Sequence, residues 1–216
     1  MAITRGTVTK LEFSGATPAA QNVTVAANCK QIRIFSSNFQ ATLDSCSVGG
    51  SATTQAVTAG PTGNSNIISI RYIDSPATGT VAIQPVYSGS PSEGPIFYVE
   101  QITADGTLSV IDADADVKDG VATASATSTS NTGDFVTALG ATFDSEPTIN
   151  GTLIDQQTFN SDQGKLFDLT AGAATTNATC SSEYASVALI VVRETAAPEE
   201  AAAPQGTGLF SLGFGL

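Results

Sequence analysis

Histidine and tryptophan are both absent from the sequence, and lysine and arginine together number only eight. Without histidine, the chain lacks the commonest general base at neutral pH, histidine-activated nucleophiles and histidine-containing metal sites. Eight scattered basic residues form no stripe that could neutralise nucleic-acid phosphates. We therefore expect a protein that is not an enzyme, has no cofactor and does not bind nucleic acid.

Cysteine is also scarce, since Cys29, Cys46 and Cys180 are the only three. This odd number lacks the spacing of a metal site, so we expect three buried free thiols, with a Cys29–Cys46 bridge as the alternative. No apolar run at the N-terminus resembles a secretory signal, and none elsewhere is long enough to cross a bilayer. We expect a protein made in the cytoplasm without a signal peptide and without a membrane partner.

What the sequence does contain is typical of an all-β protein. Apolar residues make up 41% of the chain and charged residues only 13%, with threonine, serine, alanine, valine and glycine prominent. Short runs with period-two apolar residues alternate with turn residues, a pattern typical of sandwiches and jelly rolls. The expected strands are residues 7–13, 21–27, 31–35, 39–43, 53–58, 66–73, 79–87, 96–103, 107–117, 121–127, 134–142, 148–154, 165–170 and 183–194.

The distribution of charge suggests two units. Residues 1–88 carry five basic and three acidic residues, whereas residues 89–216 carry three basic and seventeen acidic ones. A Gly- and Pro-rich segment lies where the balance changes. We predict an N-terminal β-sandwich over 1–88, a linker at 89–95, an acidic β-sandwich over 96–194, a Pro/Ala-rich spacer at 195–208 and an apolar tail at 209–216.

Local signals refine the second unit. Asp105-Gly106 and Asp119-Gly120 are strong hairpin signals. Residues 187–192, Val-Ala-Leu-Ile-Val-Val, are continuously apolar, so both faces of this strand should be buried in a sheet.

Three aspartates, Asp112, Asp114 and Asp116, alternate along one of the expected strands. Their spacing matches the start of a calcium loop, but Val117 and Thr123 occupy the positions of its glycine and closing glutamate. We expect a half-buried strand with the aspartates in water, and an unconventional cation site at the three aspartates is the alternative. The inward residues would be Ile111, Ala113, Ala115 and Val117.

The C-terminal tail is the strongest candidate for a partner-binding site. In an extended conformation its apolar side chains at every second position would share one face. Fourteen spacer residues could carry the tail roughly 40 Å from the body. The candidate binding residues are Leu209, Phe210, Leu212, Phe214 and Leu216.

The energetics of the tail favour several copies acting together. Burying its large side chains gains roughly 7 to 15 kcal/mol, whereas ordering its backbone costs on the order of 8 to 16 kcal/mol. A single tail is therefore marginal, and a homo-oligomer would bind through multivalency. Docking onto another protein, exchange within an oligomer, folding back onto its own sheet and disorder all remain open.

The short N-terminus and the β-rich segments QNVTVAA (21–27) and KQIRIF (30–35) resemble bacteriophage virion components. Among these, the organisation of the chain is similar to that of head decoration, or cement, proteins. The resemblance implies a homotrimer on the capsid surface of the virion, made in the host cytoplasm, whose partner is the major capsid protein. It also implies that the protein staples neighbouring capsomers, with residues 209–216 as the arm and no catalytic residue.

A binding module associated with a phage tail or fibre, recognising a host surface glycan, is the alternative function. Such a module needs an aromatic-bearing loop region, and the sequence shows none clearly. Its carboxylates alone do not indicate a glycosidase, because the aromatic platforms that usually grip sugars are missing.

Overall fold

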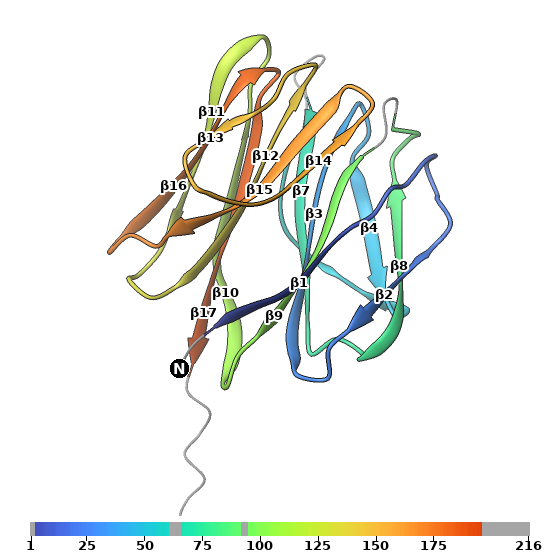
Figure 1. Ribbon diagram of the computed structural model, residues 1–216, viewed down its shortest axis with the longest axis vertical. Coiled ribbons are helices and arrows are strands. Elements are labelled where there is room, and N and C mark those ends of the chain that lie inside the picture. The colour runs from blue at the N-terminus through green and yellow to red at the C-terminus, as the bar shows by residue number, and fades with distance from the viewer. Residues whose placement is uncertain (1–2, 61–65, 92–94, 196–216) are drawn as a thin grey trace, which may run out of the picture.

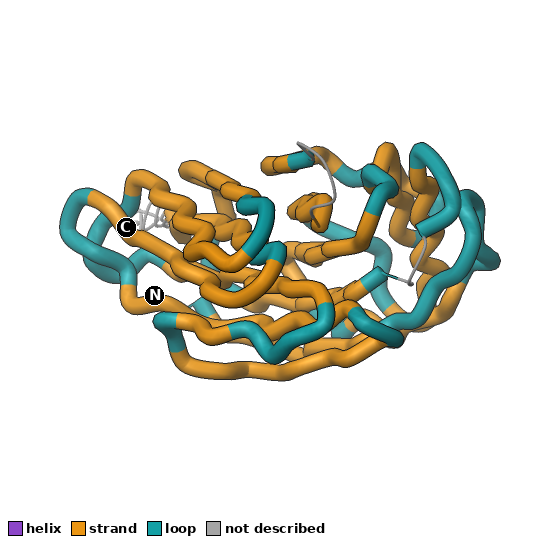
Figure 2. Tube along the Cα trace, turned by 90° about the horizontal axis from the view of Figure 1, so that it is seen from above, coloured by secondary structure: helices purple, strands orange, loops and turns teal. Residues whose placement is uncertain are grey.

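The computed structural model describes residues 3–60, 66–91 and 95–195, and these residues form strands, turns and loops only (Figure 1). Seventeen strands occur in them, and every pairing is antiparallel. Seen from above, the trace likewise alternates between strand and loop (Figure 2). The predicted all-β fold is confirmed. Within these ranges there is no helix that could span a membrane.

The first β-sandwich consists of two sheets that enclose one apolar core. Its core contains Ile32 and Ile34 from one sheet and Val81 and Ile83 from the other. Sheet A has the order β1 (Thr4–Lys10), β9 (Ile96–Thr103), β3 (Cys29–Phe39), β7 (Asn66–Asp74) and β6 (Thr54–Ala59). Sheet B has the order β2 (Gln21–Val25), β8 (Gly79–Tyr87), β4 (Leu43–Val48) and β5 (Ser51–Ala52).

The second β-sandwich has the same plan. Its core contains Val187, Leu189 and Val191 from one sheet and Ala126 and Ala178 from the other. Sheet C has the order β10 (Thr107–Val117), β17 (Ser186–Thr195), β12 (Phe135–Phe143), β15 (Asp162–Thr170) and β14 (Thr152–Phe159). Sheet D has the order β11 (Val121–Thr129), β16 (Thr175–Glu183) and β13 (Thr148–Ile149).

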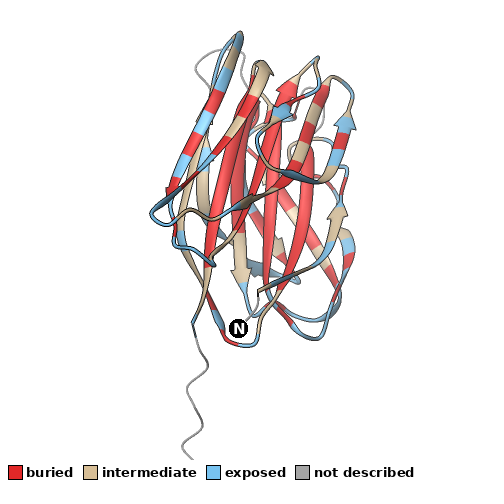
Figure 3. Cartoon of the chain, turned by 60° about the vertical axis from the view of Figure 1, so that its left-hand side comes forward, coloured by how far each residue is buried: buried red, intermediate tan, exposed pale blue. Residues whose placement is uncertain are grey.

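Sheets A and C pack against each other, so the layers follow the order B, A, C, D. The core between them joins Phe35, Ile70 and Tyr98 of sheet A to Leu166 and Ile190 of sheet C. The inner strands are buried along much of their length, whereas the outer strands alternate between buried and exposed residues (Figure 3). The two sandwiches therefore share a third hydrophobic core.

β17 shows how a sequence pattern specifies a central layer. Its odd-numbered residues from Val187 to Val191 face sheet D, and Ala188, Ile190 and Val192 face sheet A. The predicted burial of both faces is confirmed, because the strand lies inside sheet C between two other layers.

The boundary predicted at residues 89–95 is wrong. β9, which was expected to open the second unit, lies in sheet A between β1 and β3, where Glu100 pairs with Arg33. The chain passes to the second sandwich in the turn at 104–106 instead. The Gly- and Pro-rich segment joins two strands of the first sandwich, and the change in charge balance does not coincide with a change of sandwich.

The two Asp-Gly turns are not hairpins between paired strands. The turn at 104–106 leads from sheet A to sheet C, and the turn at 118–120 leads from sheet C to sheet D. Gly120 has a φ of 71°, so the dipeptide supplies a tight reversal that joins two layers. The strand expected at 39–43 is also replaced by a turn, in which Gln40 has a φ of 68°.

Candidate functional site

The predicted partner-binding residues of the tail, 209–216, lie outside the described residues, as does the spacer from residue 196 onward. The structure does show where this segment leaves the body. Thr195, the last residue of β17, pairs with Thr107, and Thr4 of β1 pairs with Thr103. Both described ends of the chain therefore flank the turn at 104–106, at one pole of the molecule (Figure 1).

A shallow cavity of about 260 Å³ lies at this pole, between the start of β1 and the end of β17. Arg193 and Asp134 both line it, and Arg193 donates two hydrogen bonds of 2.8 Å to Asp134, from Nε and Nη2. These bonds lower the pKa of Asp134. The pole thus contains a fixed ion pair beside the point where the C-terminal segment begins.

The three aspartates of β10 occupy a position that neither sequence interpretation anticipated. Their Oδ2 atoms accept hydrogen bonds from the backbone N–H groups of β11, each at 2.8 Å. The pairs are Asp112 with Thr129, Asp114 with Thr127 and Asp116 with Ser125.

Two of these carboxylates also bind their own strand. Asp112 Oδ1 accepts the Ala113 N–H at 2.9 Å, and Asp116 Oδ1 accepts the Val117 N–H at 3.0 Å. The Lys118 ammonium donates to Asp116 Oδ1 at 2.9 Å. Burial acts to raise the pKa of Asp116, but its hydrogen bonds to Ser125 and Lys118 outweigh this and lower it.

This arrangement corrects the expectation that the aspartates point into water. The other side of β10 behaves as predicted, because Ala113, Ala115 and Val117 pack against the core between sheets A and C. Ile111 does not, since it is 36% exposed. No group of metal-ligating side chains capable of holding an ion occurs within residues 3–60, 66–91 and 95–195, so the structure does not assemble the alternative cation site.

A second cluster of charges lies between the two sandwiches, and the sequence did not predict it. We call Arg5, Arg33, Glu100 and Asp168 the inter-sandwich charge cluster. Glu100 Oε1 accepts a hydrogen bond from Arg5 Nε at 2.6 Å, and Glu100 Oε2 lies 2.9 Å from Arg33 Nη2. Arg5 Nη1 reaches across to Asp168 Oδ2 of sheet C at 2.6 Å. The cluster therefore ties β1, β9 and β3 to β15.

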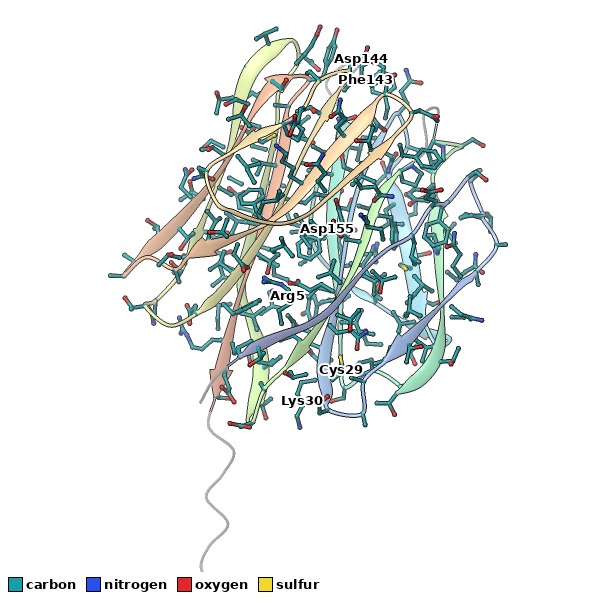
Figure 4. All side chains as sticks on the ribbon, in the orientation of Figure 1. Arg5, Cys29, Lys30, Phe143, Asp144 and Asp155 are labelled. Carbon is teal, nitrogen blue, oxygen red and sulfur yellow. The ribbon has the colours of Figure 1, made fainter. Side chains whose placement is uncertain are left out.

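Two members of this cluster are fully buried, whereas Asp168 lies at its exposed end. Arg33 and Glu100 have no exposed side-chain surface, and both guanidinium groups lie about 5 Å from the centre of the Phe135 ring. Burial lowers the pKa of Arg33, whereas the bond to Asp168 and the charge of Glu100 overcome burial and raise the pKa of Arg5. Figure 4 places Arg5 near the middle of the molecule. The signal in the sequence was a lone charge within an apolar strand, at Arg33 and at Glu100.

Aromatic packing links the sandwiches toward the opposite pole. Phe39 at the end of β3 stacks on Phe143 at the end of β12, with ring centroids 5.1 Å apart. Tyr184 meets Phe143 edge-on at 6.3 Å. Figure 4 shows Phe143 at the upper end of the molecule. The contact between the sandwiches thus combines an ionic cluster, an apolar core and an aromatic stack.

The largest cavity among those observed, about 510 Å³, opens beside β15 and β16. Its lining is polar and contains no aromatic side chain: Asn150, Gly151, Thr152, Asp168, Leu169, Thr170, Gly172, Thr175, Thr176 and Asn177. Asn150 Nδ2 donates to the carbonyl of Asn177, and Asn150 Oδ1 accepts the Thr179 N–H. The cavity offers hydrogen-bonding groups without a stacking platform.

All three cysteines are buried free thiols, as predicted. Burial raises the pKa of both Cys46 and Cys180 to about 12, so at pH 8 the reactive thiolate amounts to roughly one part in ten thousand. We expect no reaction with Ellman's reagent in the folded protein and three reactive thiols after denaturation without reductant. A denatured protein that releases only one thiol would instead indicate a Cys29–Cys46 disulfide.

Comparisons with models of known protein families, with curated proteins and with solved structures give no match. The function proposed below therefore rests on the chain itself: its fold, the pole near which its described ends lie and the sequence that follows Thr195.

Proposed function

We propose that this protein is a structural virion component that binds the outside of a phage capsid and staples neighbouring capsomers. The observation that carries the proposal is the exit of the chain at Thr195, beside the start of β1, with 21 residues still to follow. Those residues include the alternating apolar sequence from Phe210 to Leu216. In this proposal the body docks on the major capsid protein and the C-terminal segment serves as its arm.

The described surface of the body carries few exposed apolar side chains, which is consistent with an arm that makes the apolar contact. Only three large apolar side chains are exposed in the described part of the chain: Ile111, Val121 and Leu153. They come from β10, β11 and β14, and none is accompanied by a second exposed large apolar residue on its own strand. In this proposal the apolar contact with the partner is made by the sequence beyond Thr195, and the role requires no catalytic residue.

Truncation tests the proposal directly. We expect the full chain to co-sediment with empty capsids of its phage, and a chain ending at Thr195 to lose this binding by at least about tenfold. A matched full-length variant with serine at Phe210, Leu212, Phe214 and Leu216 keeps the length and charge of the arm. It should behave like the truncation, because it loses the apolar area that drives binding.

Two outcomes would contradict the proposal. Capsid binding unchanged in both variants would show that the arm is not an anchor. Light scattering that finds a strict monomer would remove the multivalency on which the arm depends, since the proposal expects a trimer.

A glycan-binding module of a phage tail or fibre is the second candidate, and the polar cavity beside β15 and β16 is the feature that favours it. Its amide and hydroxyl groups match the hydrogen-bonding needs of sugar hydroxyls. Glycan-array binding by the chain ending at Thr195, without any binding to capsids, would favour this candidate.

A further inference from the structure

The two sheets of the second sandwich meet along one side without pairing. β10 is the edge of sheet C and β11 is the edge of sheet D, and the turn at 118–120 connects them. An edge strand normally presents a row of unpaired N–H groups, to which a strand from another molecule can add. Along this side, the carboxylates of β10 accept hydrogen bonds from the N–H groups of β11.

These hydrogen bonds between β10 carboxylates and β11 N–H groups follow a regular register. Asp112, Asp114 and Asp116 advance by two residues while Thr129, Thr127 and Ser125 recede by two, as in an antiparallel ladder. Each bond is 2.8 Å long, within the range of charge-assisted hydrogen bonds. Side-chain oxygens thus take the place that backbone carbonyls would have in a neighbouring strand.

We propose that this row is an acid-sensitive seam, in which the ionised carboxylates of Asp112, Asp114 and Asp116 hold the edge of β11 closed. Protonation of the carboxylates removes their charge and weakens the hydrogen bonds that cover the three N–H groups. The closed seam blocks strand addition to β11 at neutral pH.

The charges around the seam are few. β11 itself and β6 carry no charged residue. In the turn and on the strands that pack beside the seam, the charged residues are Lys118, Asp119, Glu183, Arg193 and Glu194; on β7 and β3, which contact the opposite face of β10, they are Arg71, Asp74, Lys30 and Arg33. Lys118 binds Asp116, and Arg193, which lies opposite Ser109 near the Asp112 end of the row, is held by Asp134.

The direction of the pH effect follows from the folded state. The pKa of Asp116 is lowered by its partners, so its contribution is complete above the pKa of the unfolded chain and disappears as the pH falls through the folded value. The seam is therefore closed at neutral pH and weakens in acid.

Amide hydrogen exchange followed by NMR tests the seam residue by residue. Between pH 7 and pH 3, the protection factors of Ser125, Thr127 and Thr129 should fall by about tenfold or more. The intervening amides of Ala124 and Ala126 point toward β16 and serve as internal controls, because they should stay protected. Equal loss at all five amides, or no loss at the first three, would overturn the proposal.

Variants of the central aspartate separate charge from hydrogen bonding. Asp114→Ala removes the acceptor, so Thr127 should lose about tenfold in protection already at pH 7. Asp114→Asn retains an oxygen acceptor but no titratable charge, so Thr127 should stay largely protected and no longer respond to acid. If the alanine variant does not fold, the asparagine variant still decides, because an acid response at Thr127 identical to that of the unmodified protein would overturn the proposal.

Discussion

Replacement of Glu100 by alanine is expected to lower the free energy of unfolding by about 3 to 5 kcal/mol. Glu100 is fully buried and is the carboxylate on which Arg5 and Arg33 converge, at 2.6 and 2.9 Å. Its removal leaves the guanidinium group of Arg33 buried without a carboxylate beside it and brings two like charges together. Urea denaturation, followed by the circular dichroism of the β-sheets, measures the loss.

Two matched variants show whether the loss arises from the buried charge. Glu12 is exposed, so Glu12→Ala should change stability by less than about 0.5 kcal/mol. Glu100→Gln keeps the shape and one acceptor but removes the charge. Its loss of unfolding free energy should therefore lie between those of Glu12→Ala and Glu100→Ala. A Glu100→Ala variant as stable as Glu12→Ala would show that the inter-sandwich charge cluster does not hold the sandwiches together.

The structure also explains why this cluster was beyond sequence analysis. Arg5 lies 95 residues from Glu100 and 163 from Asp168 along the chain. The order of strands β1, β9 and β3 brings Arg5 to Glu100, and the packing of sheet C on sheet A brings Asp168 to both. Strand order is a non-local property that periodicity does not contain. What the sequence could indicate was the oddity of a lone charge inside an apolar strand.

The hydrophobic pattern along the sequence predicted most of the strands and their buried faces. The continuous apolar run in β17 predicted burial of both faces, and the period-two pattern predicted most strands of the first sandwich. The predicted boundary between the sandwiches was wrong because a Gly/Pro-rich composition, such as that of the segment before β9, is also typical of ordinary loops within one domain. The prediction that the aspartates of β10 point into water was also wrong. Their partners are backbone N–H groups of β11, which no side-chain motif can reveal.

Sheets A and C approach each other closely at Gly164 of β15. A Cβ atom added there would lie 2.5 Å from Cγ2 of Ile96, too close for two carbon atoms. The carbonyl of the same glycine accepts a hydrogen bond from the hydroxyl of Tyr98 at 3.1 Å. This position therefore reports on the contact between the two sandwiches.

Gly164→Ala is expected to lower the free energy of unfolding by about 1 to 3 kcal/mol, because Ile96 and its strand must shift to admit one methyl group. Gly89 offers a matched control: an added Cβ would meet nothing within 4 Å, and its φ is not positive. Gly89→Ala should be neutral or slightly stabilising. Calorimetry measures both variants and also reports whether unfolding remains a single transition.

A double variant identifies the atoms responsible. Ile96→Ala alone should cost about 2 to 5 kcal/mol by leaving a cavity, but in the Gly164→Ala background it also removes the clash. The combined loss should therefore be smaller than the sum of the two single losses by at least about 1 kcal/mol. Strict additivity would show that the sheets do not meet at this point. Two separate transitions in the unmodified protein would show that the sandwiches unfold independently, in spite of the core, the charge cluster and the aromatic stack between them.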